Sequence, residues 1–177
     1  RREVFLANGG FEVVFYTTSV EDQDFSNRLA RKGYRLVFVP KAVVYHVHDV
    51  TPWEYVRRKF KIGYWKALLL RWHPDRAVRD SHTPQVLKLQ LGMAGLLWLA
   101  LLASVFWLPS LWIALAALLL LLGSALPFLT KILVKDPPVI VVAPPLLLLR
   151  ALALGFGLVV GGVRFFGQET GRRAPIG

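Results

Sequence analysis

Two groups of side chains have the types and spacing for chemistry. The run Glu21-Asp22-Gln23-Asp24 puts three carboxylates within four positions. A carboxylate there could act as a general base if a reacting hydroxyl came within hydrogen-bond reach, although alone the run reads most simply as the acidic start of a helix. Arg57 and Arg58 carry guanidinium forks that match phosphate oxygens. A solvated or lipid-facing basic surface is the alternative for this pair.

A helix and two strands are predicted to position the carboxylates. Residues 19–32 favour a helix that Ser19 caps, that holds its acidic residues in the first turn, and that Gly33 ends. Tyr34–Val39 and Ala42–Val47 read as two strands separated by Pro40.

The arginine pair falls on a second predicted helix. Thr51-Pro52-Trp53-Glu54 forms a capping box with proline at the first helical position. The helix is expected to run to about Trp72, with aromatic and aliphatic residues on one face and basic residues on the others. An amphipathic, cationic helix just before a membrane segment is expected to lie on the membrane surface, and part of its cationic face could hold a phosphate.

Composition divides the 177-residue chain into two unlike halves. The 22 Lys and Arg residues split 16 to 6 between residues 1–88 and 89–177, and the 11 Asp and Glu residues split 9 to 2. The second half is apolar enough to dissolve in lipid. The composition excludes a single soluble globule, a disordered chain and, with no cysteine, a disulfide scaffold or thiol catalysis. The net charge of +11 fits the basic side of a membrane protein, so nucleic-acid binding is not expected.

Three apolar runs predict transmembrane helices over residues 89–108, 111–129 and 145–166. The short Pro109-Ser110 connection makes the first two a hairpin. Lys131 and Lys135 then return the chain to the basic side, which the positive-inside rule places in the cytoplasm. Residues 1–88 and the Lys131–Asp136 segment are therefore expected to share that side.

The third run has two interpretations, because Pro144-Pro145 breaks or kinks a helix. It is either one tilted span that begins near Pro145, or a short interfacial or re-entrant piece followed by the span. Arg150 is either a functional buried cation or an anchor that reaches the interface. Glycines in this run favour close packing on another helix: Gly155, Gly157, Gly161 and Gly162.

The order of the motifs in the first half carries a resemblance. Gly9-Gly10-Phe11, the acidic run, Arg28, Gly33-Tyr34, Pro40 and His46 follow one another in the pattern "GGF … ED.D…R…GY…P…V.H". Over roughly residues 1–75 this resembles the C-terminal half of the catalytic domain of family 2 glycosyltransferases, in which a membrane hairpin often follows. The stretch Glu54-Tyr55-Val56-Arg57-Arg58 departs from the QxxRW motif of the related processive synthases, which argues against a polysaccharide synthase.

The resemblance implies roles for particular residues. Asp22 corresponds to the general base that takes the proton of the acceptor hydroxyl, and Glu21 to a residue that orients the motif or the acceptor. Asp24, Arg57 and Arg58 are assigned to the substrate and its diphosphate. His46 corresponds to a metal ligand found in some members, with a structural histidine as the alternative; His48 is a weaker candidate. A Mg²⁺ or Mn²⁺ ion would be bound mainly by the N-terminal half of the family's domain.

The fold class expected is therefore α/β, a partial GT-A domain, followed by helical membrane spans. Residues 1–75 form the glycosyltransferase part, 76–88 a linker, 89–166 the membrane helices and 167–177 a polar tail. Because the chain opens at Arg1 without a methionine, it is expected to be a fragment that lacks the donor-binding half.

The activity expected is inverting transfer of a sugar from a nucleotide-sugar to a lipid-linked or cell-envelope acceptor at the inner membrane. The alternatives are a non-catalytic, membrane-anchored docking or assembly module, and a transporter subunit. Few spans and a single charge within them disfavour the transporter.

Overall fold

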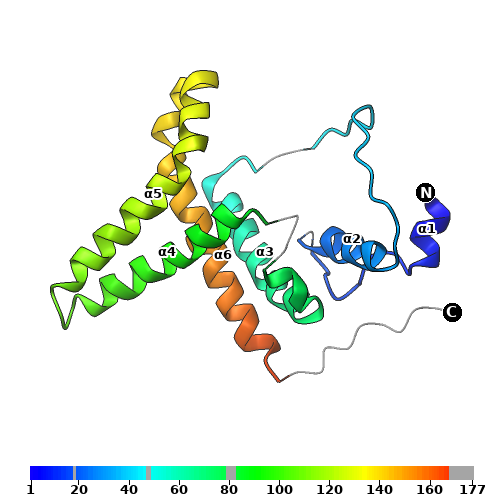
Figure 1. The fold of residues 1–177 in the computed structure, drawn as a ribbon, viewed down its shortest axis with the longest axis horizontal. Coiled ribbons are helices and arrows are strands. Elements are labelled where there is room, and N and C mark those ends of the chain that lie inside the picture. Colours follow the sequence, from blue (N-terminus) through cyan, green and yellow to red (C-terminus); the bar gives the residue numbers. More distant parts are fainter. Residues whose placement is uncertain (18, 47–48, 79–82, 168–177) are drawn as a thin grey trace.

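A computed structural model describes residues 1–17, 19–46, 49–78 and 83–167. These residues form six α-helices and two short 3-10 segments (Figure 1). In chain order they are α1 (Arg2–Ala7), α2 (Glu21–Arg31), α3 (Pro52–Trp72), η1 (Pro74–Ala77), α4 (Gln85–Ala103), α5 (Ser110–Lys135), η2 (Pro137–Val141) and α6 (Ala143–Phe165).

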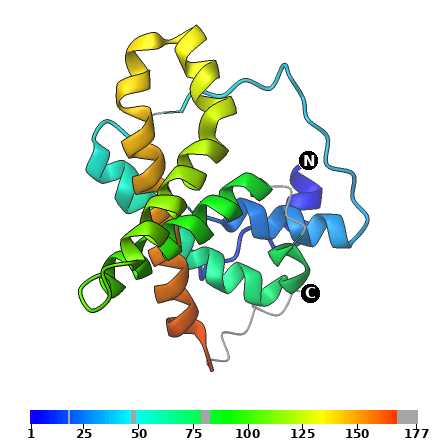
Figure 2. The ribbon, with the colours of Figure 1, turned by 60° about the vertical axis from the view of Figure 1, so that its left-hand side comes forward.

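The expected α/β class is wrong, because no strand forms in the part of the chain that the structure describes. The two predicted strands fall in the segment that connects α2 to α3, and this segment arcs away from the helices (Figure 2). Its side chains face solvent, with Phe38 87% and Tyr45 101% exposed. A strand is stabilised by bonds to a neighbouring strand and by a buried face, and this segment has neither among the described residues. Val47, the last predicted strand residue, lies outside them.

The two predicted helices of the first half are present: α3 spans Pro52–Trp72 as predicted, and α2 is shorter than the predicted 19–32. α2 begins at Glu21, and its N-cap residue is Val20 rather than the predicted Ser19. No side chain forms a capping hydrogen bond at this end of the helix. Gly33 follows the helix with φ of +81°, a left-handed conformation that glycine adopts at little cost. The N-cap half of the predicted capping box is confirmed, because the Thr51 hydroxyl accepts the Glu54 N–H at 3.2 Å. The Glu54 carboxylate accepts the N–H of Val50 at 3.0 Å, one residue before the N-cap.

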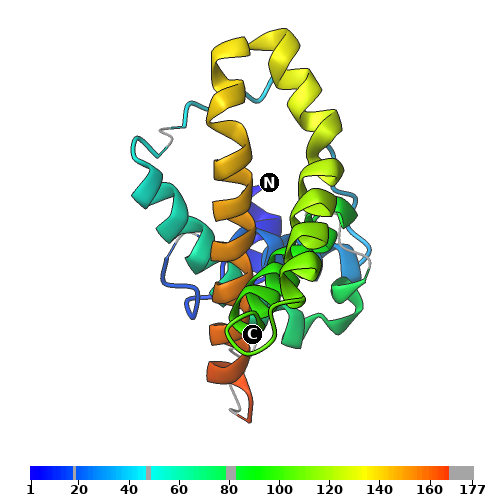
Figure 3. The same ribbon diagram turned by 90° about the vertical axis from the view of Figure 1, so that its left-hand side faces the viewer.

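Among the described residues, three helices are long and apolar enough to cross a membrane: α4, α5 and α6. α4 and α5 form a hairpin, and η2 joins α5 to α6 at the ends that lie uppermost in Figure 3. α5 continues past Pro127 to Lys135, and the Thr130 hydroxyl donates to the carbonyls of Leu126 and Pro127. Pro144 lies at the start of α6, where a helix needs no backbone donor.

The α3–α6 interface depends on glycine. A Cβ atom at Gly63 would collide with the Leu154 carbonyl, and Cβ atoms at Gly157 and Gly161 would collide with the carbonyls of Phe60 and Tyr64. The two backbones therefore approach closely and run parallel. The expected close packing of the third apolar run is confirmed at Gly157 and Gly161, and its partner is α3.

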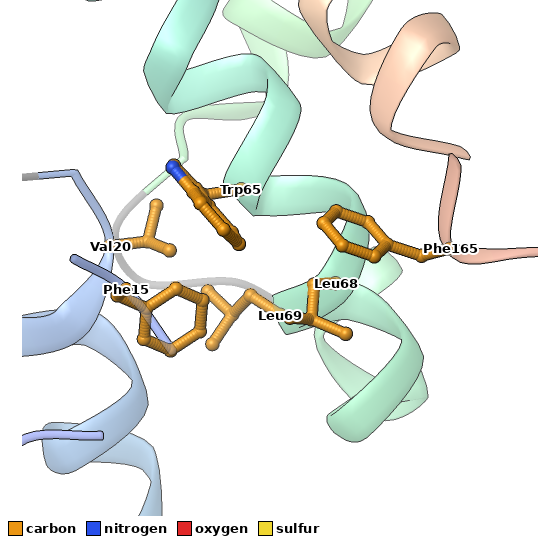
Figure 4. Close-up of a cluster of buried hydrophobic side chains, with 6 residues drawn as sticks. All are labelled: Phe15, Val20, Trp65, Leu68, Leu69 and Phe165. Atoms are coloured by element: carbon orange, nitrogen blue, oxygen red, sulfur yellow. The ribbon is translucent and has the colours of Figure 1, made fainter. Parts of the chain in front are cut away.

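A buried apolar cluster joins the first half to the membrane helices (Figure 4). Trp65, Leu68 and Leu69 of α3 lie at its centre, between the segment that precedes α2 and the end of α6. Phe15 packs edge-to-face on Trp65, with ring centroids 5.7 Å apart. This cluster sets where α2 lies relative to α3.

Candidate functional site

The acidic start of α2 presents one carboxylate to solvent. Asp22 is exposed in the first helical turn, and its Oδ1 accepts the N–H of Gln23 at 2.7 Å. Glu21 is half-buried, and its Oε2 accepts the Ser19 N–H at 2.7 Å, which fixes the turn that enters the helix. The partial positive charge of the helix N-terminus stabilises carboxylates at these positions. Asp22 is thus held in place and open to a ligand.

Asp24, two residues further on, is enclosed. Its side chain is 0% exposed; Oδ2 accepts from Arg28 Nε at 2.8 Å, and Oδ1 lies 2.9 Å from His73 Nε2, which is also fully buried. Protein groups therefore occupy both carboxylate oxygens. This arrangement removes Asp24 from the groups that can touch a diphosphate and makes it a link between α2 and the end of α3.

Arg28 extends that link to the Gly9-Gly10 turn. Its Nη1 and Nη2 atoms donate to the carbonyls of Asn8 and Gly10, each at 2.5 Å. Gly9 and Gly10 have φ of +72° and +63°, so the turn that presents these carbonyls needs glycine. We call Asp24, Arg28, His73 and this turn the clamp. The sequence contains no signal that would bring His73 to Asp24, because 49 residues separate them.

The predicted diphosphate contacts on α3 do not meet the acidic turn. Arg57 is exposed, while Arg58 pairs with Asp49, with Nη2 and Oδ2 2.6 Å apart. The cation that joins α3 to α2 is instead Lys66, whose Nζ donates to Gln23 Oε1 at 2.8 Å. Lys66 lies eight residues beyond Arg58, about 12 Å along the helix.

The predicted metal ligand lies in the segment between α2 and α3. His46 is exposed on the extended segment, and His48 lies outside the described residues. Within the described ranges no group of three or more His, Asp or Glu side chains could hold a metal ion. A divalent metal, which the resemblance assigns mainly to the N-terminal half of the family's domain, therefore stays a prediction.

Arg150, for which the sequence allowed either a functional buried cation or an interfacial anchor, takes part in hydrogen bonds that connect the membrane helices. Its Nη2 donates to Gln90 Oε1 at 2.7 Å, and Gln90 Nε2 donates to the Ser124 hydroxyl at 3.2 Å. One polar chain thus connects α6, α4 and α5. Gln90 is buried, which makes its pairing with Arg150 important for the bundle.

Comparisons with known proteins agree with the motif order. The O-antigen chain rhamnosyltransferase WbaN of Salmonella anatum is 36% identical over 67 residues, which are 38% of this chain and 21% of that protein. The chain thus spans about a fifth of that relative's length. No solved structure matches. The family described as glycosyl transferase family group 2 matches residues 1–132, about three quarters of the chain. The chain belongs to this glycosyltransferase family.

Proposed function

We propose that this chain belongs to a membrane-bound, inverting glycosyltransferase that transfers a sugar from a nucleotide-sugar to a lipid-linked or cell-envelope acceptor. The observation that carries the proposal is Asp22, a solvent-facing carboxylate on a helix whose other face is fixed by the clamp. Asp22 takes the proton of an acceptor hydroxyl while the hydroxyl oxygen attacks the anomeric carbon. The bond from that carbon to the diphosphate breaks, and the nucleoside diphosphate leaves.

Other residues support this step. Glu21 holds the turn that positions Asp22. Arg57 is exposed, and its guanidinium fork suits phosphate oxygens. Its assignment to the diphosphate comes from the resemblance, because the structure does not bring Arg57 to the acidic turn. Arg58 can bind the diphosphate as well only if it shares or breaks its ion pair with Asp49. A divalent cation remains a prediction from the resemblance.

A direct experiment tests the reaction class. The full-length protein in membranes is given a panel of nucleoside-diphosphate sugars, beginning with rhamnose donors because the curated relative is a rhamnosyltransferase. We expect release of the nucleoside diphosphate together with a lipid-soluble product of inverted anomeric configuration. A folded protein that transfers no sugar from any donor would favour the alternative of an assembly module, to which the exposed apolar segment at residues 34–46 would then belong.

The isolated 177-residue chain is a separate case. We expect it neither to bind a nucleotide-sugar measurably nor to transfer sugar, because few groups are available to stabilise the transition state around the donor. Calorimetric titration with UDP- and GDP-sugars in the presence of Mn²⁺ tests this. Saturable binding in the micromolar range would contradict it.

We propose that the membrane is the inner membrane and that residues 1–88 and Lys131–Asp136 face the cytoplasm. α3 packs along α6, and Arg71 near the end of α3 donates to the Phe165 carbonyl at the end of α6. Cysteines that replace exposed Phe38, Phe106 or Val134 in this cysteine-free chain report the sides. Positions 38 and 134 should be labelled from the cytoplasm and 106 from outside; labelling of 38 and 106 from one side would overturn this topology.

A further inference from the structure

α6 lies side by side with α3, and the two helices share one depth relative to a membrane. A Cβ atom at Gly63 of α3 would collide with the Leu154 carbonyl of α6, and a Cβ atom at Gly161 of α6 would collide with the Tyr64 carbonyl of α3. The backbones therefore touch at two successive levels, and both helices run in the same direction. Wherever α6 lies in or beside the bilayer, α3 lies at the same level.

α3 is too strongly charged to lie in hydrocarbon. Lys59, Lys61 and Lys66 flank Gly63, which is one of the points where α3 touches α6. A charged side chain at the centre of a bilayer is costly unless it is paired or reaches the interface. If α6 crossed the bilayer, it would carry these charges into the hydrocarbon with it. The six basic residues of α3 are Arg57, Arg58, Lys59, Lys61, Lys66 and Arg71.

The two ends of α6 point to the same conclusion. Phe165 at its C-terminal end belongs to the buried cluster that contains Phe15 and Val20, and Val20 directly precedes the acidic run (Figure 4). This end therefore lies beside the polar half of the chain. The other end follows α5 and η2, and thus the Lys131–Asp136 segment, which we propose to face the cytoplasm with residues 1–88. A helix with both ends on one side of a membrane does not cross it.

α6 also crosses the beginning of α4 instead of running along it (Figure 1). Arg150 Nη2 donates to Gln90 Oε1 at 2.7 Å, and a Cβ atom at Gly155 would lie 3.7 Å from Leu91 Cδ2. Between these two contacts α6 advances five residues, about 7.5 Å, while α4 advances by one. The crossing angle is therefore steep. It lies near Gln85, where α4 begins.

The exposed face of α6 is apolar. Phe156, Val159 and Val163 are exposed and recur at helical spacing, which places them in one stripe. Gly157 and Gly161 lie in the buried stripe that packs on α3. The α3–α6 pair thus joins an apolar outer face to a basic helix. Helices that lie in a membrane interface combine an apolar face with basic residues in this way.

We propose that α6 does not cross the membrane and that the α3–α6 pair lies in the cytoplasmic interface, with only α4 and α5 crossing. The partner of the exposed stripe of α6 is the boundary between the lipid headgroups and the acyl chains. The basic side chains of α3 then lie at the level of the headgroups, where anionic lipids attract them. This inference rests on the topology given with the proposed function. It places the acidic turn of α2 beside the membrane surface.

Cysteine labelling of the full chain in sealed membrane vesicles tests the proposal. Single cysteines replace Phe166 after α6, Val134 near the end of α5, and Phe106 at the tip of the α4–α5 hairpin, all of which are exposed. We expect positions 166 and 134 to be labelled from the cytoplasmic face and position 106 from the opposite face.

The labelling pattern separates two failures. Position 134 labelled from the cytoplasmic face and position 166 from the opposite face would show that α6 crosses, and would overturn the inference alone. Position 134 labelled from the outer face would overturn the topology, and the inference with it. Labelling needs no turnover. The expected pattern in a full-length protein that transfers no sugar would therefore refute only the proposed function.

The depth of α6 in the bilayer provides a second measurement. A fluorophore on Val159→Cys is compared with one on Leu119→Cys, near the middle of α5; the parent side chains are 63% and 60% exposed. The lipids carry a quencher at the headgroup or at the end of an acyl chain. We expect the headgroup quencher to be at least about twofold more effective at position 159, and the chain-end quencher at position 119. Stronger quenching by the chain end at both positions would overturn the proposal.

Matched lysine substitutions test the same contrast without a fluorophore. Val159→Lys should leave the labelling of a cysteine at position 106 unchanged, because a lysine on an interfacial helix reaches the headgroups. Leu119→Lys places its charge in the middle of a crossing helix and should reduce the labelled fraction at position 106 from the outer face. An equal loss of labelling in the two variants would contradict the interfacial position of α6.

Discussion

Asp22 and Asp24 lie two residues apart on one helix in opposite environments. Asp22 is exposed at the edge of α2, whereas Asp24 is fully enclosed by Arg28 and His73. The comparison divides the acidic run into two functions: its buried face fastens α2 to the rest of the molecule, and its exposed edge is left for chemistry.

The clamp matters because polar links do much of the fastening of α2. Besides the clamp, Gln23 reaches Lys66, and Arg31 reaches Asp75 of η1 at 2.5 Å. The Arg31–Asp75 pair is exposed and contributes little. A substitution on the buried face of α2 is therefore expected to change the stability of the protein, and a substitution at its exposed edge to change the rate of sugar transfer.

The largest effect is expected at the exposed edge. Asp22→Asn keeps the shape of the side chain and removes the base, so sugar transfer by the full-length protein should fall by about 10²–10⁴-fold. The free energy of unfolding should fall by no more than about 1 kcal/mol, because an exposed carboxylate gains about 0.3–1 kcal/mol from the helix N-terminus. Initial rates with a hydroxyl acceptor provide the measurement.

A change at the buried face should act on stability instead. Asp24→Asn leaves Arg28 without its carboxylate, and removing one member of a buried ion pair costs about 3–5 kcal/mol. The fluorescence of Trp65 and Trp72, which pack on Phe15, reports unfolding. An unfolding free energy equal to that of the parent would show that the clamp does not hold α2.

The same contrast can be made on α6 with neighbouring glycines. Gly161→Leu collides with the backbone of Tyr64 and should cost at least about 1–3 kcal/mol, because α3 and α6 must separate. Gly162→Leu meets open space and is the control. Equal thermal unfolding of the two variants would contradict the α3–α6 interface.

The smallest difference is expected between the two arginines. Arg57→Gln should raise the KM for the nucleotide-sugar about tenfold without changing stability, because the side chain is exposed. Arg58→Gln should mainly lower stability, by about 1 kcal/mol or less, because a partly exposed ion pair with Asp49 is lost. Steady-state kinetics beside thermal unfolding separate the two.

Local signals predicted the parts of the fold that depend on few residues. The apolar runs, the N-cap at Thr51 and the end of α2 before Gly33 are examples. The prediction of two strands was wrong because the residues at 34–47 have side chains that suit a sheet, but residue type alone does not supply the neighbouring strand with which a strand must pair. The Asp24–His73 contact could not be predicted, since it depends on how α3 ends beside α2.

The most direct test compares Asp22→Asn and Asp24→Asn in the same preparation, with each transfer rate divided by the fraction of folded protein. If Asp22 is the base and Asp24 a structural link, the corrected rate should fall by about 10²–10⁴-fold for Asp22→Asn and stay within a few-fold of the parent for Asp24→Asn. A near-normal corrected rate for Asp22→Asn, or a larger loss for Asp24→Asn, would contradict this division of roles.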